Sequence, residues 1–476
     1  MHNVKKPSLA LALIPFAFLI AFMLIGVIIL EVEPHIPLIA ASIVTAIIGK
    51  YLGHSWEDME RAMIESNATV MQANLIILIV GCLIGTWIAG GIVPGLIYYG
   101  LNLFTPSIFL PLVPVVCAVI SVSTGSAWTT AGTIGIACMG IGAGLGIPAA
   151  MTAGAVVTGA SFGDKISPLS DSTNLAAAVS ETNLFDHIRH MLYTTVPSLI
   201  LSIIIYAIMS MGYRGQTTDV AQIDTITNIL DDLFWISPAI FIAPLFVILM
   251  IAFKVPAVPG MIGGTMVGVV FSFLQGNTLK ETLYYLYYGY EITVGHEMLD
   301  KLLNRGGLVS MLEVTALVIC AMCFGGLIKQ VGCIDTILNS LLKYFRSRGS
   351  IILSNIIACI AMNFMAADQY MAIVIPGQMY KPIYKKLNLH SKNLSRVLED
   401  AGTLTSGLVP WSTCGAVYLA TLGVSAFEYG RYHLLGLICP IISAIYGYTG
   451  FSLARLNEDE PIKDYIEDED TLKEIE

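Results

Sequence analysis

The chain has 476 residues, of which 56% are hydrophobic and only 12% are charged, and its mean hydropathy is +0.76. The charged share is about half of that in an ordinary globular protein, too little to cover the surface of a soluble molecule of this length. The composition therefore excludes a cytosolic enzyme, a nucleic-acid-binding protein and a disordered scaffold, and it predicts an all-α polytopic membrane protein.

The formal net charge of −10 is concentrated at the C-terminus. The last twenty residues, Asn457–Glu476, hold ten acidic and two basic side chains, which leaves a charge of −2 for the rest of the chain. We therefore expect residues 455–476 to form an acidic cytoplasmic tail, and the chain offers no basic surface for nucleic acid.

The first apolar run, Leu9–Leu30, follows Lys5 and Lys6. The run is long enough to span a bilayer and has no clear small-residue cleavage site, so we interpret it as a transmembrane helix rather than a signal peptide. Nine more apolar runs follow along the chain: Ile36–Ile48, Ala73–Ala89, Ile108–Ile120, Met191–Met211, Phe234–Phe253, Gly260–Leu274, Thr315–Ile328, Ile351–Met362 and Leu434–Leu453.

Several of these runs are shorter than the ~20 residues that an upright crossing needs, and stretches rich in small polar residues separate them. Glycine, proline and polar residues at membrane depth are tolerated where broken helices or re-entrant loops line a cavity. We therefore predict broken helices and re-entrant hairpins at four stretches: Ser121–Thr133, Gly154–Asn174, Asn363–Gln369 and Glu399–Gly415.

The interruptions occur in pairs. A shift of 242 residues aligns Ser121–Ile200 with Asn363–Ile442 without a gap, and Pro168 then falls on Pro410. Few residues are identical, but the turn-forming residues recur in the same order. This pattern predicts two structural repeats of about five transmembrane helices each, with an insertion in the second near Tyr290–Met311.

The distribution of charge predicts that the repeats, 1–212 and 233–454, are inverted. The N-terminal lysines and Arg455 place both termini in the cytoplasm, and the acidic linker 213–232 suits the extracytoplasmic side. Basic clusters flank Ser350–Gln378, so this segment should enter and return or cross twice. An odd number of net crossings per repeat satisfies these constraints and gives a multi-pass protein of the cytoplasmic membrane.

The strongest chemical signal lies between Gly159 and Ala176, where two carboxylates, a lysine, several hydroxyls and one amide stand between apolar flanks. A hard cation such as sodium favours oxygen ligands, by analogy with calcium and magnesium. A helix broken by Gly163 and Pro168 would free carbonyls and present a helix end. The candidate binding residues here are Asp164, Lys165, Ser170, Asp171, Ser172, Thr173 and Asn174, of which Asp171, Thr173 and Asn174 are the expected Na⁺ ligands.

A simpler alternative for this stretch is a polar loop whose Asp171 or Ser172 caps the following helix. Lys165 is expected to pair with Asp164 or to compete with sodium for that carboxylate. Its alternative is a lysine whose ammonium extends to the membrane interface.

The string Ser161–Ala176, SFGDKISPLSDSTNLA, resembles the signature of the NhaC family of sodium/proton antiporters in the ion transporter superfamily. The resemblance covers most of the chain, including Ala367–Tyr370 and Leu398–Thr403. It implies a bacterial or archaeal cytoplasmic-membrane antiporter with inverted repeats and re-entrant hairpins. The family also includes antiporters that exchange malate and protons for lactate and sodium, and the motif does not separate the two activities.

The second half adds further candidates. Asp368 lies between apolar segments, where a carboxylate is costly and suggests a function, although it could instead cap a broken helix. Of two adjacent acids, Asp400 is the weakly favoured cavity residue, and Glu399 is expected to pair with Arg396. The candidate binding residues of this half are Asp368, Gln369, Asp400, Ser412 and Thr413.

Other motifs have simpler interpretations. The nine cysteines, Cys320 and Cys323 included, lie in apolar surroundings typical of small hydrophobic side chains rather than of metal ligands or disulfides. The glycines of Gly140–Gly146 indicate helix packing rather than a phosphate-binding loop. His187 and His190 lie in a polar connection, where pH sensing is an alternative to a structural role.

We therefore predict a secondary antiporter that exchanges Na⁺ for H⁺, because a carboxylate that binds either ion couples them by competition. The first alternative, exchange of malate and H⁺ for lactate and Na⁺, needs positive helix ends or a cation such as Lys165 in the cavity. The remote alternatives are an intramembrane enzyme, whose motifs are lacking, and a passive channel. We expect no cofactor besides the transported Na⁺ and H⁺, and the expected partners are membrane lipid, these ions, small carboxylates in the alternative, and a second copy in a homodimer.

Overall fold

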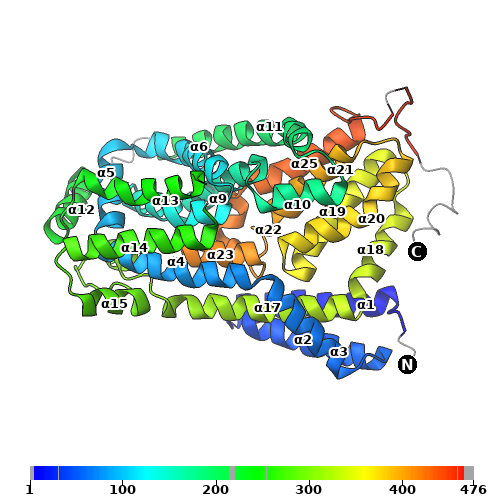
Figure 1. Cartoon of the computed structure of the whole chain (residues 1–476), viewed down its shortest axis with the longest axis horizontal. Helices are drawn as coiled ribbons and strands as arrows, with labels where there is room; N and C mark the ends of the chain where they lie inside the picture. Colours follow the sequence, from blue (N-terminus) through cyan, green and yellow to red (C-terminus); the bar gives the residue numbers. More distant parts are fainter. Residues whose placement is uncertain (1–4, 31, 214–219, 254, 458, 466–476) are drawn as a thin grey trace.

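The computed structural model describes residues 5–30, 32–213, 220–253, 255–457 and 459–465, and the regular secondary structure of these residues is helical apart from two isolated β-bridges. Most long helices run along the long axis of the molecule (Figure 1). The described chain begins and ends toward one end of this axis, whereas α12 (Val220–Leu233) lies at the other. Residues 214–219 of the predicted linker and the predicted tail beyond residue 465 lie outside the described residues.

Seven helices in the described part of the chain are long and apolar enough to cross a membrane. Two bent pairs, 224–250 with a bend of 88° and 426–449 with a bend of 56°, raise the number of candidate spans to nine. The seven are α2 (His35–Leu52), α4 (Met71–Ala89), α6 (Pro106–Thr124), α11 (Leu184–Met211), α14 (Ala257–Leu274), residues 309–330 with α17 (Leu312–Gln330), and α19 (Arg348–Ala366). The expected all-α chain with several membrane-length helices is confirmed.

The remaining elements are shorter or interrupted. The predicted first membrane helix is helical as α1 (Leu9–Met23) followed by the π-helix Leu24–Ile29. The others are α3 (Trp56–Thr69), α5 (Ile92–Leu103), α7 (Ala127–Thr130), α8 (Ile136–Gly144), α9 (Ala149–Ile166), α10 (Asp171–Ser180), α13 (Ile242–Ala252), α15 (Leu279–Tyr288), α16 (Glu297–Leu303), α18 (Cys333–Tyr344), α20 (Gln369–Lys386), α21 (Ser391–Val397), α22 (Leu404–Ser406), α23 (Thr413–Leu422), α24 (Ala426–Tyr429) and α25 (Leu434–Thr449).

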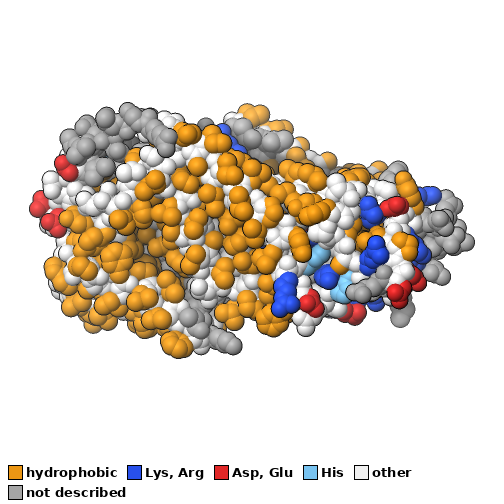
Figure 2. Space-filling view, turned by 90° about the horizontal axis from the view of Figure 1, so that it is seen from above, with side chains coloured by type: hydrophobic (Ala, Val, Ile, Leu, Met, Phe, Trp, Pro, Cys, Tyr) orange, Lys and Arg blue, Asp and Glu red, His pale blue; other side chains and the backbone are white. Residues whose placement is uncertain are grey.

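The outer surface is apolar over much of its area. Figure 2 shows hydrophobic side chains across most of one face, whereas Lys and Arg gather toward one end. Side chains such as Ile43, Ile47, Ile204 and Ile445 are at least half exposed on helices of membrane length or in a bent pair. A surface of this kind is stable against lipid and unfavourable in water.

The helix boundaries recur along the chain. Helices α6 and α19 begin and end 242 residues apart. The same spacing relates α10 to α23, and it relates the segment from the start of α7 to the end of α8 to α20. The sequence shift of 242 residues therefore reproduces the ends of these helices, although few residues are identical.

Glycines permit several helices to pack closely against one another. A Cβ atom at Gly163 of α9 would lie 2.5 Å from Ser121 Cβ and 2.6 Å from Ala118 O of α6. Gly140 and Gly144 of α8 likewise face side chains of α5, as expected for small-residue helix contacts. The α6–α9 contact holds the end of α9, which carries Asp164 and Lys165, against α6.

Candidate functional site

A cavity of about 350 Å³, here called the central cavity, lies where several helices begin or break. Three helices, α7, α10 and α20, begin at this cavity. Helix α7 continues through a π-helical turn into α8. The ends of α9, α10, α22 and α23 gather near the middle of the molecule (Figure 1). The lining residues are Gln72, Ile76, Thr124, Gly125, Ser126, Ala127, Trp128, Thr129, Asp164, Leu169, Ser170, Asp171, Ser172, Val255, Pro256, Ala257, Gln369 and Tyr370.

Four of the predicted residues in the first half line this cavity together: Asp164, Ser170, Asp171 and Ser172. The hydroxyls of Ser170 and Ser172 lie 3.2 Å apart. Asp171 is exposed and Asp164 is half-buried, so neither carboxylate is sealed from an ion that enters. The cavity therefore combines two carboxylates with hydroxyl groups, an oxygen-rich set that suits a hard cation.

Thr173 and Asn174, two of the expected Na⁺ ligands, have different contacts. The Thr173 hydroxyl donates to the Lys165 carbonyl at 2.8 Å. The Asn174 amide donates to the carbonyls of Pro168 at 2.9 Å and Ser170 at 2.7 Å. Neither residue lines the central cavity, and both hold the turn between α9 and α10 in place.

The second break, between α19 and α20, has a similar construction. Ala367 adopts a positive φ of 56°, and Oδ1 of Asp368 accepts a hydrogen bond from the Tyr370 amide at 2.7 Å. Asp368 is buried and caps α20 instead of lining the cavity, which matches its structural alternative. Gln369 and Tyr370 do line the cavity, and Gln369 Oε1 accepts from Cys414 Sγ at 3.0 Å.

Ser412 and Thr413 lie at the start of α23. Ser412 Oγ accepts from the Gly415 amide at 3.0 Å and donates to the Ser406 carbonyl at 2.6 Å, so it serves as a helix cap. The Thr413 hydroxyl is buried and has no hydrogen-bond partner in the described part of the chain. The structure places neither side chain on the cavity wall.

Lys165 and Asp400 form a fully buried ion pair between α9 and the π-helix Leu398–Thr403. The expected pairing of Lys165 with Asp164, and the interfacial alternative, are both wrong, because the lysine faces away from solvent. Asp400 Oδ1 also accepts from Thr194 Oγ1 at 2.9 Å and from Cys439 Sγ at 3.2 Å. The pair joins the two halves of the chain beside the central cavity.

Glu399 is a functional candidate that the sequence analysis assigned elsewhere. Its carboxylate is fully buried, and neither oxygen has a hydrogen-bond partner among the described residues. Arg396, its expected partner, donates instead to Ser452 Oγ at 2.7 Å. The available signal was the pair of adjacent acids, since neighbouring helical residues point about 100° apart and face different surroundings.

Sequence reasoning also missed the position of His187. This residue of α11 is fully buried, and its two ring nitrogens have no partner in the part of the chain that is described. The charges that act on it include Lys165 and Asp400, so it belongs to the same polar interior. The described residues contain no group of three His, Cys, Asp or Glu side chains that would suit a transition-metal ion.

Comparison with known proteins identifies the family. The model of the Na⁺/H⁺ antiporter family matches residues 3–173 and 159–451. The chain belongs to this family. It is 38% identical to a Na⁺/H⁺ antiporter NhaC of Alkalihalophilus pseudofirmus over 95% of this chain and 98% of the relative.

Other relatives are named for different transport activities. A malate-2H⁺/Na⁺-lactate antiporter of Bacillus subtilis is 36% identical over 94% of this chain and 96% of the relative. An arginine/ornithine antiporter ArcD of Halobacterium salinarum is 34% identical over 96% of this chain and 95% of the relative. The resemblance to the NhaC family is thus confirmed, and this member is a multi-pass secondary antiporter rather than an enzyme.

Proposed function

We propose that this NhaC-family protein exchanges Na⁺ for H⁺ by alternating access across the cytoplasmic membrane. The observation that carries the proposal is the central cavity, in which Asp164 and Asp171 stand beside the hydroxyls of Ser170 and Ser172 at a helix break. The name of the 38% identical relative agrees with this choice. The proposed Na⁺ ligands are these four side chains, and Thr173 and Asn174 position them through the α9–α10 turn.

The exchange follows from the chemistry of the carboxylates. A carboxylate oxygen that holds a proton is a poor ligand for sodium, so binding of one ion releases the other. The N-termini of α10 and α20 carry partial positive charge, which stabilises the ionised carboxylates when sodium has left. Opposite ion gradients across the membrane can then drive each other through one site.

Exchange of small carboxylates is a second candidate. Three helical segments begin at the central cavity, and helix N-termini are suited to anionic groups. The 36% identical relative is named as a malate-2H⁺/Na⁺-lactate antiporter. The buried ammonium of Lys165 is already paired with Asp400, so it supplies no free charge for a carboxylate substrate.

Reconstitution into proteoliposomes tests the first candidate against the second. We expect an imposed Na⁺ gradient to drive proton movement, followed with an internal pH-sensitive dye, in a buffer without organic acids or amino acids. Proton movement that requires malate on one side and lactate on the other would support the second candidate. Failure of a Na⁺ gradient to move protons both without organic acids and with malate and lactate present would reject both candidates.

We further propose that residues 1–212 and 233–454 are inverted repeats joined by an extracytoplasmic linker, with cytoplasmic termini. The equal spacing of helix boundaries supports the repeats. The position of α12 at the end of the molecule opposite to the first and last described residues supports the inversion (Figure 1). Two broken hairpins that meet at one cavity are what such repeats produce.

Cysteine labelling tests this topology. In a background without native cysteines, Asp231→Cys on the exposed side of α12 should react with an impermeant thiol reagent added outside intact cells. Lys6→Cys, also exposed, is the matched control and should react only after the membrane is opened. Labelling of the two positions from the same side would contradict the inversion.

A further inference from the structure

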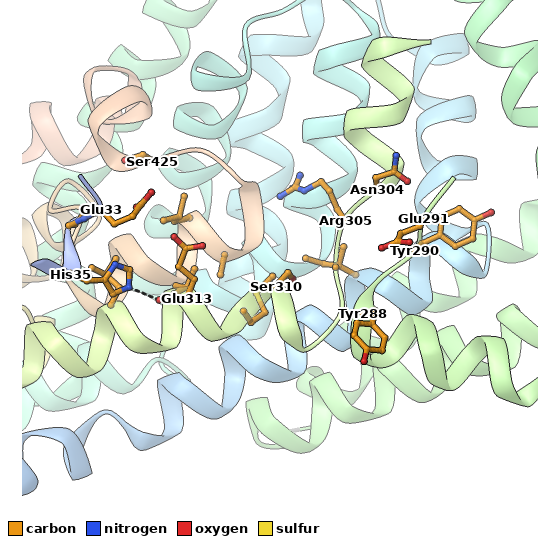
Figure 3. Close-up of a pocket in the computed structure, with 18 of the residues that line it drawn as sticks. Glu33, His35, Tyr288, Tyr290, Glu291, Asn304, Arg305, Ser310, Glu313 and Ser425 are labelled. Carbon is orange, nitrogen blue, oxygen red and sulfur yellow. Dashed lines mark hydrogen bonds between the residues drawn. The ribbon is translucent and has the colours of Figure 1, made fainter. Parts of the chain in front are cut away.

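A second cavity, of about 660 Å³, lies apart from the central cavity and shares none of its lining residues. The start of α2, the connection between α15 and α17, and the end of α23 form its walls (Figure 3). An apolar cluster lies between the two cavities. Two of its members, Met311 and Val314, line the second cavity, and Trp128, which packs against the cluster, lines the central cavity. We call the second cavity the Arg305 pocket.

Arg305 is a half-buried cationic residue on the wall of this pocket. Its side chain lines the pocket (Figure 3), and its guanidinium has no hydrogen bond and no ion pair with any described residue. Burial lowers the pKa of the Arg305 guanidinium, and no neighbouring charge opposes this shift. The guanidinium is only half-buried and has no anionic partner in the part of the chain that is described, so its N–H groups are accessible to an anion that enters the pocket.

The backbone of Arg305 is held rigidly. Gly306 and Gly307 both adopt positive φ, at 88° and 81°, and the Gly307 amide donates to the Gly81 carbonyl of α4 at 2.7 Å. A Cβ atom at Gly81 would lie 2.5 Å from the Gly307 carbonyl oxygen, so only glycine permits this approach. The Tyr290 amide donates to the Arg305 carbonyl at 3.3 Å. The guanidinium is therefore presented from a fixed main chain.

The side chain of Arg305 is held as well. Its guanidinium lies against Gly423, the residue with φ of 70° that ends α23, and a Cβ atom there would collide with it. The C-terminal end of a helix carries partial negative charge, which favours the guanidinium at that place without neutralising it. The N–H groups of Arg305 remain available to a ligand.

The acids of the pocket stand at its rim. Glu33, Glu291 and Glu313 line the pocket but are exposed, and His35 Nε2 lies 2.9 Å from the Glu313 carbonyl oxygen (Figure 3). Solvent screens such exposed charges, but three of them raise the cost of bringing in a multiply charged anion. The rim carboxylates thus disfavour a multiply charged anion, and the single guanidinium matches a ligand with one negative charge.

We propose that the Arg305 pocket binds a small monocarboxylate, held by two parallel N–H···O bonds from the guanidinium. A planar guanidinium matches a carboxylate in this bidentate way. The apolar residues Ile84, Met311 and Val314 line the same cavity and suit the hydrocarbon end of such a ligand. This site is additional to Na⁺/H⁺ exchange and does not depend on it.

Binding of radiolabelled propionate to the purified full-length protein tests the proposal without any transport assay. We expect saturable binding of the radiolabelled propionate. Unlabelled propionate should compete for the site, whereas the neutral propionamide should not. Arg305→Gln should weaken binding about tenfold or more, the usual effect of losing a charge-assisted pair. Arg305→Lys should bind with intermediate strength, because it keeps the charge but loses the fork geometry.

Glu291→Gln is the matched charge control. This exposed rim residue should be dispensable for folding, and its loss should tighten propionate binding about two- to threefold at low ionic strength. Equal binding by the wild type and Arg305→Gln, competition by propionamide, or tighter binding of succinate than of propionate would each overturn the proposal. Because no ion flux is measured, its failure is distinct from a failure of Na⁺/H⁺ exchange.

Discussion

Replacing Lys165 by methionine should leave little folded protein. In the native chain its ammonium neutralises Asp400, and both side chains are fully buried. Without the lysine, the Asp400 carboxylate keeps only the hydrogen bonds of Thr194 and Cys439 at Oδ1, and Oδ2 has no partner. Breaking a buried pair in this way costs about 3–5 kcal/mol, which is a large share of the stability of a folded domain.

The yield of monodisperse protein and its thermal unfolding in detergent measure this effect. The double variant Lys165→Met with Asp400→Leu removes both charges, so we expect it to recover most of the yield. A single Lys165→Met variant with the thermal stability of the wild type would mean that the pair does not hold the two halves together. Recovery of folding without recovery of exchange would show that the pair also serves transport.

Replacing Asp171 by asparagine is expected to reduce Na⁺/H⁺ exchange to background, while the protein still inserts and purifies. The exposed carboxylate lies on the wall of the central cavity, so the substitution removes a charge that attracts Na⁺ and accepts the competing proton. An interaction of a charged group with its ligand contributes about 1.5–3 kcal/mol, or roughly ten- to 150-fold in affinity. Asp164→Asn should have a comparable effect for the same reason.

The control for both variants is Asp186→Asn. Asp186 is an exposed carboxylate in the first turn of α11, and it does not line the central cavity. We expect it to exchange Na⁺ at the wild-type rate. Normal exchange by Asp171→Asn, measured per reconstituted molecule, would remove Asp171 from the site.

The interruptions between helices could be predicted from the sequence. Pro168 and the polar residues around it predicted the interruption between α9 and α10, and the stretch Asn363–Gln369 predicted that between α19 and α20. The shift of 242 residues anticipated the helix boundaries, because turn-forming residues constrain the backbone more than apolar residues do. These features are local, and local propensity is what a sequence expresses directly.

The ion-pair and hydrogen-bond partners of the charged residues could not be predicted in the same way. Lys165 and Asp400 are 235 positions apart, and only the folded chain brings them together. Thr173 and Asn174 carry oxygens suited to sodium, but the α9–α10 turn uses their hydrogen bonds, because unsatisfied carbonyls at a broken helix need donors. Arg305 lies in the predicted insertion near Tyr290–Met311, where no repeat partner pointed to it.

In the proposed exchange, Na⁺ and H⁺ compete for the carboxylates of the central cavity. The most direct measurement is the Na⁺ concentration for half-maximal exchange in proteoliposomes at a series of pH values. If one proton displaces one Na⁺, this concentration should rise as pH falls, approaching about tenfold per pH unit, while the maximal rate at saturating Na⁺ is preserved. A half-maximal Na⁺ concentration that stays constant across the pH series would show that the two ions do not compete for one site.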